Sequence, residues 1–153
     1  MNFKYKRLIT SFFLSCFFIH SFAQMIDFSN SKIVCFEKND KHVLKALTVL
    51  QEEVKKRSGI MLPVSKKWKP KEAPVIAVGL EGQIEKFPEE YQKIVASIPS
   101  IKSEGYKIAV SESSKTVLVV GKDARGILFG IGKLLRKMEI RPGQILVPDN
   151  LEI

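Results

Sequence analysis

Apolar and polar positions along residues 31–59 predict a strand followed by a helix. The segment SKIVCF is short and rich in β-branched and aromatic residues, which is typical of a strand. After it, apolar side chains recur every three or four positions, at Val43, Leu47, Leu50 and Val54. Asn39 or Asp40 can cap this segment, and Gly59 offers a left-handed stop, so we expect a helix between them.

The middle of the chain contains two further apolar runs. IMLPVS follows the helix directly, and its Pro63 indicates an edge strand or a strand end. After the loop KKWKPKEAP, the run PVIAVGL is typical of a buried strand. The next segment, EGQIEKFPEEYQKIVASIPS, is polar and interrupted by prolines, with room for one short helix from about Glu89 to Ser97. We expect this segment to be an excursion from the core.

The last third predicts a hairpin, a second helix and a final strand. Strands Tyr106–Val110 and Thr116–Val120 are joined by the polar turn SESSK. A helix capped by Asp123 runs from about Ala124 to Met138, and ILVP follows as a last short strand. Because a hairpin replaces a parallel crossover, we expect an α+β fold: a mixed or antiparallel sheet with two main helices on one face.

Glycines at the strand-to-helix corner are better explained by packing than by phosphate binding. Gly121 and Gly126 have the spacing of a phosphate-binding loop, but Ile127 and Leu128 stand where lysine and a hydroxyl residue are needed. A dinucleotide fingerprint fails as well, because its third glycine is missing. We interpret Gly121, Gly126 and Gly130 as structural glycines that let the helix and sheet backbones approach closely.

One large apolar side chain of the second helix lies off its apolar stripe. At 100° per residue, Ile127, Ile131, Leu134 and Met138 share one face. Phe129 projects from the opposite side, among basic residues. We interpret Phe129 as part of a contact surface for something outside this chain.

The first residues have the three regions of a secretory signal peptide. Three basic side chains precede the apolar run from Leu8 to Ile19, and Ala23 precedes Gln24. We therefore predict a signal peptide over residues 1–23 and an exported, periplasmic or extracellular domain. Lipid attachment at Cys16 is the alternative, but apolar residues continue past it, which favours cleavage after Ala23. No segment is long and apolar enough for a membrane span.

The charge and the cysteine content argue against two features, a nucleic-acid partner and an intramolecular disulfide. Without residues 1–23, 130 residues remain and the formal charge falls from +9 to +6. Lysines spread along the chain indicate a solvated surface, and nucleic acid is a poor partner for an exported protein. Cys35 would be the only cysteine left, so an intramolecular disulfide cannot form, and its apolar neighbours place it in the core.

No residue pattern predicts catalysis, a metal or a cofactor. A zinc protease needs H-E-x-x-H, whereas His42 stands between Lys41 and Val43. The acidic pairs Glu52–Glu53 and Glu89–Glu90 are adjacent and diverge on a helix, and Asp123 serves as a cap. For stacking against a sugar ring, Trp68 is the best candidate, ahead of Tyr91 and Tyr106.

The segment EGYKIAVSESSKTVLVVGKDARGILFGIGKLLRKM resembles the amino-terminal domain of secreted glycoside hydrolases. The family 67 α-glucuronidases and the family 20 β-N-acetylhexosaminidases share a strand beginning near Glu-Gly-Tyr and a helix of the form G-x-L-Y/F-G-x-x-x-L. This chain matches the strand at Glu104, Gly105 and Tyr106 and the helix at Gly126, Leu128, Phe129, Gly130 and Leu134. An earlier strand, helix and LPVS follow the same order, so the resemblance covers about residues 32–153.

The resemblance implies a non-catalytic accessory domain over residues 24–150, with a zincin-like fold in shape only. Residues 151–153 would begin a catalytic barrel absent from this chain, and that barrel would be its partner through a face including Phe129. The glucuronidase type is preferred over the hexosaminidase type. The alternative is a free-standing secreted module that binds polysaccharide through Trp68.

Overall fold

The computed structural model describes residues 24–37, 39–68, 74–97 and 99–153. The predicted signal peptide, with Cys16, lies outside the described residues. The elements are, in chain order, β1 (Met25–Asp27), β2 (Lys32–Cys35), α1 (Lys41–Ser58), β3 (Val64–Ser65), β4 (Val75–Leu80), η1 (Glu81–Lys86), α2 (Glu89–Ser97), β5 (Tyr106–Ser111), β6 (Thr116–Gly121), α3 (Ala124–Lys137), β7 (Glu139–Arg141) and β8 (Gln144–Pro148).

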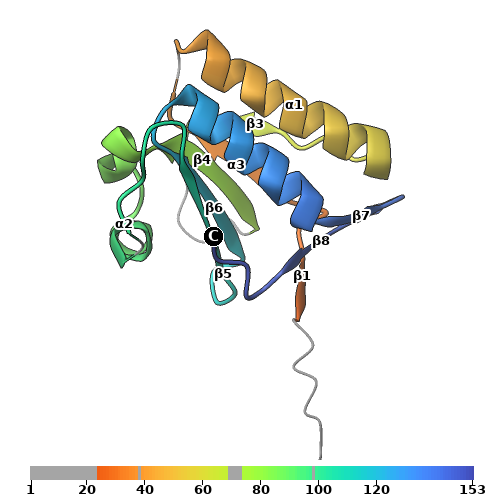
Figure 1. Cartoon of the computed structure of the whole chain (residues 1–153). Helices are drawn as coiled ribbons and strands as arrows, with labels where there is room; N and C mark the ends of the chain where they lie inside the picture. Colours follow the sequence, from red (N-terminus) through yellow and green to blue (C-terminus); the bar gives the residue numbers. More distant parts are fainter. Residues whose placement is uncertain (1–23, 38, 69–73, 98) are drawn as a thin grey trace, which may run out of the picture.

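The main sheet is five-stranded and mixed, with the order β3-β2-β4-β6-β5 (Figure 1). Strands β3, β2, β4 and β6 are parallel neighbours, and β5 pairs antiparallel with β6. The predicted hairpin and the α+β class are therefore confirmed. Strand β3 follows Pro63 at one edge, where the proline removes no ladder hydrogen bond from a central strand.

The two main helices pack on one face of this sheet, as predicted (Figure 1). The Asp40 side chain caps α1 by accepting hydrogen bonds from the backbone N–H groups of His42 and Val43, and Gly59 ends the helix at φ 78°. The predicted stripe of α3 is buried, and Cys35 lies in the same core, where burial raises the pKa of its thiol.

The opposite face of the sheet is covered by η1 and α2, which corrects the expectation of an excursion from the core. Phe87, Tyr91 and Val95 are buried and pack against the second face of the sheet. The physical reason lies in β4: five of its six residues are buried, because a central parallel strand needs cover on both faces. Four charged residues of this segment, Glu85, Lys86, Glu89 and Glu90, are exposed, and they mask its apolar side in the sequence pattern.

A separate three-stranded antiparallel sheet has the order β1-β8-β7. Strand β8 contains the predicted ILVP, whereas the sequence patterns gave no signal for the three-residue strands β1 and β7. Gly143, at φ 74°, makes the turn between β7 and β8, and its N–H donates to the carbonyl of Ser58 at 2.8 Å. This sheet is thereby held at the carboxyl end of α1.

The last residues of the chain lie along the outer edge of β5. Ile153 N–H donates to the Ile108 carbonyl at 2.9 Å, and Ile108 N–H donates to the Ile153 carbonyl at 2.8 Å. Glu152 stands opposite Ala109 in an antiparallel bridge. Among the described residues, no helix combines the length and apolar character needed to cross a lipid bilayer.

Candidate interdomain surface

The start of α3 is fixed by Asp123. Its side chain accepts hydrogen bonds from the N–H of Gly126 at 2.9 Å and from the N–H of Glu104 at 2.8 Å. These bonds favour the ionised carboxylate, the bond from Gly126 most, and hold the pKa of Asp123 below its ordinary value. Asp123 is thus a structural cap that ties the loop before β5 to the first turn of α3.

Three glycines stand where helix, strand and loop backbones meet. A Cβ on Gly121 would overlap the backbone nitrogen of Ile127, and a Cβ on Gly126 would overlap the carbonyl oxygen of Gly105. A Cβ on Gly130 would lie 2.8 Å from Cγ1 of Val119. The absence of side chains at these positions therefore sets how closely α3 packs on β6 and on the preceding loop.

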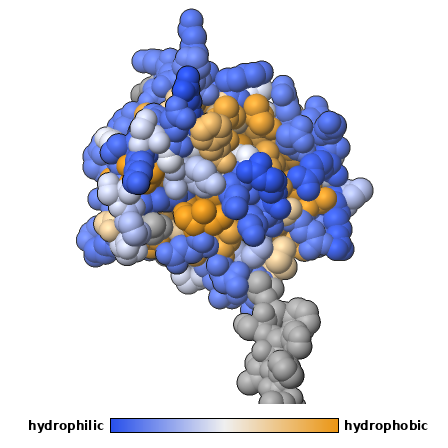
Figure 2. Space-filling model, in the orientation of Figure 1, coloured by the Kyte–Doolittle hydropathy of each residue, from blue (hydrophilic) through white to orange (hydrophobic). Residues whose placement is uncertain are grey.

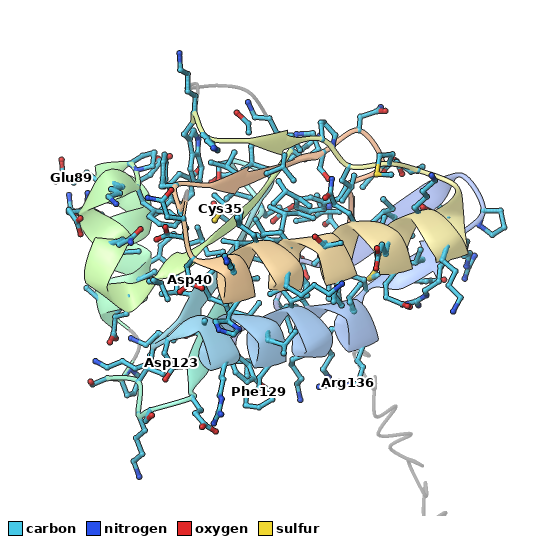
Figure 3. All side chains as sticks on the ribbon, turned by 90° about the horizontal axis from the view of Figure 1, so that it is seen from above. Cys35, Asp40, Glu89, Asp123, Phe129 and Arg136 are labelled. Atoms are coloured by element: carbon cyan, nitrogen blue, oxygen red, sulfur yellow. The ribbon has the colours of Figure 1, made fainter. Side chains whose placement is uncertain are left out.

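The outer side of α3 carries the two exposed apolar residues of this helix. Phe129 is 48% exposed and Leu128 is 41% exposed. In Figure 3, Phe129 points away from α3 on the side opposite α1. Figure 2 shows apolar side chains reaching the surface over α3 and the neighbouring part of α1, and again around the carboxy-terminal end. Leu128, which the helical spacing did not assign to this surface, extends it toward α1.

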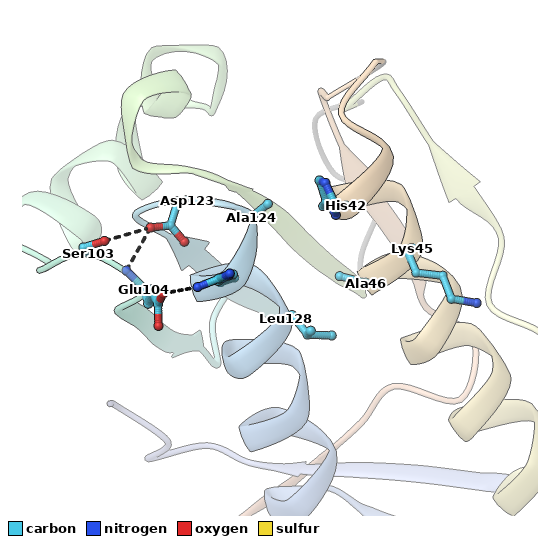
Figure 4. Close-up of a pocket in the computed structure, with 9 residues that line it drawn as sticks. His42, Lys45, Ala46, Ser103, Glu104, Asp123, Ala124 and Leu128 are labelled. Atoms are coloured by element: carbon cyan, nitrogen blue, oxygen red, sulfur yellow. Dashed lines mark hydrogen bonds and ion pairs between the residues drawn. The ribbon is translucent and has the colours of Figure 1, made fainter.

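A groove of about 650 Å³ runs between the amino-terminal turns of α1 and α3 (Figure 4). His42 and Lys45 line it from α1, and Arg125 and Leu128 line it from α3. Arg125 donates to the Glu104 carboxylate at 2.5 Å, which raises the pKa of the Arg125 guanidinium. His42 thus lies at the surface near a helix start, in a groove that Glu104 and Asp123 also line.

The aromatic candidates for sugar stacking take part in packing. Trp68 is half-buried, with its ring centroid 4.6 Å from that of Tyr91 and 6.0 Å from that of Phe87. Tyr91 is 3% exposed and its hydroxyl lies 3.1 Å from Oγ1 of Thr116, so it cannot serve as a platform. Tyr106 packs against Gly130. Sugar binding by Trp68 stays a prediction.

The described residues hold no group of three or more histidine, cysteine or acidic side chains that could bind a metal ion. Glu52 and Glu90 are exposed, and Glu89 forms an ion pair with Lys93 one helical turn away at 2.8 Å. None of these carboxylates lines the groove between α1 and α3. Of the carboxylates that line it, Glu104 accepts from the Arg125 guanidinium and Asp123 accepts from the Gly126 N–H.

An ionic cluster under η1 was not predicted from the sequence. Glu81 accepts a hydrogen bond from Lys122 at 2.8 Å and lies 3.8 Å from the ammonium of Lys107. Lys107 is buried and also donates to the carbonyl of Val95 at 3.0 Å, at the end of α2. These residues come from η1, α2, β5 and the loop after β6, so no local pattern could have indicated the cluster. The cluster holds η1 and α2 against the β5–β6 hairpin.

Acid is expected to reduce the stability that the Glu81 cluster contributes to the fold. The hydrogen bond from Lys122 lowers the pKa of Glu81 from its ordinary 4.5 most, with smaller contributions from the charge of Lys122, the backbone of Ile101 and the charge of Lys107. Stability gained from the ionised form is present above that ordinary value and is lost as the pH falls through the lower folded-state pKa. Urea unfolding from about pH 6 to about pH 3 should therefore show a smaller loss for Glu81→Gln than for the parent chain. Glu52→Gln, an exposed carboxylate of α1, should follow the parent, and equal pH profiles for both variants would contradict the assignment.

Comparison with protein families gives one match over most of the chain. A family model described as the glycosyl hydrolase family 67 N-terminus matches residues 22–134. No curated protein sequence matches the chain at a significant level.

Solved structures of glycoside hydrolases contain a similar fold. A family GH115 4-O-methyl-α-glucuronidase with specificity for decorated arabinogalactans aligns with a TM-score of 0.59 and 16% identity, over 84% of this chain and 18% of its own length. The GH20 β-N-acetylhexosaminidase of Streptomyces coelicolor A3(2) aligns with a TM-score of 0.55 and 15% identity, over 84% of this chain and 24% of its own length. The chain thus spans about a fifth to a quarter of these enzymes. At such identities, the likeness shows the fold.

Proposed function

This chain belongs to the family of glycosyl hydrolase family 67 N-termini, and we propose that it packs against the catalytic barrel of an exported polysaccharide-degrading enzyme. The match over residues 22–134 carries this proposal. An accessory domain of glycoside hydrolases needs no catalytic residues of its own. The barrel would supply the two carboxylates of glycoside hydrolysis, which face each other about 5–10 Å apart across the sugar.

The family favours an α-glucuronidase-like parent over a β-N-acetylhexosaminidase-like one. The basic and apolar pattern of residues 1–23 supports export, because its order is that of a secretory signal peptide. The barrel would pack on the outer side of α3, where Phe129 and Leu128 are exposed. Aromatic side chains at such a position contribute strongly to an interface once a partner removes them from water.

The proposal is tested first by reading the DNA beyond codon 153. We expect an open frame that continues into a barrel-sized region, either joined to this chain or as a neighbouring coding region. A stop codon with no barrel-sized region nearby would overturn the proposal. The purified chain alone should show no turnover of aryl glucuronides or aryl N-acetylglucosaminides, and turnover would overturn its non-catalytic role.

Phe129→Ala tests the face of the domain directly. With the barrel expressed as a separate chain, calorimetry should show binding weakened by about tenfold or more, because a large aromatic contact is lost. Met61→Ala is the matched control: Met61 is 52% exposed but lies outside α3, and its loss should leave the affinity unchanged. Equal affinities of the parent chain and Phe129→Ala for the barrel would show that Phe129 is not part of the interface.

A further inference from the structure

Strand β5 is an edge of the main sheet, and its outer side is partly occupied by the end of the chain. Both backbone groups of Ile108 bond to Ile153, and Glu152 stands opposite Ala109. Ile153 also packs against the core between the sheet and the two main helices. The last residues have therefore begun an antiparallel strand along β5 with a defined register.

The register fixes what the next positions would meet. Opposing residues run in reverse order in an antiparallel pair, so position 154 would oppose Lys107 and position 155 would oppose Tyr106. Backbone groups alternate in direction along a strand, so the N–H and carbonyl of Tyr106 point to the same edge as those of Ile108. A slot of about 330 Å³ lies at this place, between Tyr106 and residues 99–102, with Ile153 in its lining.

We propose that the polypeptide following Ile153 in the parent protein continues as a sixth strand on β5, to position 155 at least. This inference rests on the proposed function, because it takes a catalytic domain to follow the chain. An uncovered sheet edge is a site for unwanted pairing, and a continued strand would cover it. Figure 1 shows the marked carboxy-terminal end in front of β6, beneath α3.

The direction of this strand connects it to the candidate interdomain surface. Beyond Tyr106 the strand would pass Gly105, whose carbonyl accepts a hydrogen bond from Lys122 N–H just before α3. The connection would thus leave the domain beside the first turn of α3, the helix that carries Phe129. A hydrogen-bonded strand at this point would fix the orientation of the barrel against the domain.

Three extended chains test the register. The first adds Thr-Val-Thr at positions 154–156. The second and third carry the same extension with one residue replaced by proline, at position 155 in the second and at position 154 in the third. Amide hydrogen exchange of Tyr106, followed by NMR, should be slowed by about tenfold in the first chain relative to the present chain. Proline at position 155 keeps the carbonyl that would accept the Tyr106 N–H but removes the N–H that would donate to the Tyr106 carbonyl. The pair then loses one of its two hydrogen bonds, so the protection of Tyr106 should fall. Proline at position 154 should retain it, because the N–H of that position points away from β5.

Equal exchange of Tyr106 in all three extended chains would overturn the sixth strand. This outcome would leave the proposed function standing, since a barrel can dock through Phe129 with an irregular connection. Conversely, slowed exchange of Tyr106 with the expected effects of the two prolines would support the sixth strand even where Phe129→Ala has no effect on barrel binding. The two proposals therefore fail by separate measurements.

Discussion

Gly126→Ala is expected to destabilise the domain by about 3 kcal/mol. The new Cβ would overlap the carbonyl oxygen of Gly105. That carbonyl also accepts the N–H of Lys122 at 3.0 Å, so it cannot move without loss of the bond. Since both contacting groups belong to the backbone, no side-chain rotation relieves the overlap. The loss outweighs the gain of about 1 kcal/mol that alanine normally brings to a helix interior.

Gly132→Ala is the matched control in the same helix. At Gly132 the nearest atom to an added Cβ is the end of the flexible Arg136 side chain, at 3.5 Å. This variant should therefore gain about 0.5–1 kcal/mol through helix propensity alone. Urea unfolding measures both variants, and opposite shifts of the midpoint at an unchanged slope are expected. Stabilisation by both substitutions would show that the corner tolerates a side chain and would refute the packing role of Gly126.

Elements with strong local signals could be predicted from the sequence. The cap at Asp40, the left-handed stop at Gly59 and the apolar spacing between them specify α1 without reference to the rest of the chain. The same holds for Asp123 and α3. The exposure of Phe129 followed from helical geometry, because a residue two positions from the buried Ile127 and Ile131 lies on the other side of the helix.

Features that depend on distant partners could not be predicted. Strands β1 and β7 have three residues each and form only because β8 lies between them. His42 and Arg125 line the same groove only because α1 packs beside α3. The pairing of Ile153 with Ile108 depends on where the chain returns after β8. No window of neighbouring residues contains this information.

Phe87→Ala is expected to be strongly destabilising, by about 3–5 kcal/mol. Phe87 is 3% exposed, and its ring contacts Phe36 edge-on with centroids 5.3 Å apart. It also occupies the space that a side chain at Gly79 would take, 2.6 Å from that Cβ position. Truncation would leave a cavity between β4 and α2, and it would remove one of the rings against which Trp68 packs.

Phe129→Ala is the matched control, since it removes the same side chain from an exposed position. Its effect on stability should stay within about 0.5 kcal/mol. Urea unfolding followed by Trp68 fluorescence reports on both, because Trp68 lies next to Phe87 and outside α3. An excursion from the core, as the polar residues of η1 and α2 suggest, would make Phe87→Ala as mild as Phe129→Ala. A large difference between two identical substitutions would instead identify the segment of η1 and α2 as the cover of the second face of the sheet, because only a buried phenylalanine leaves a cavity when it is truncated.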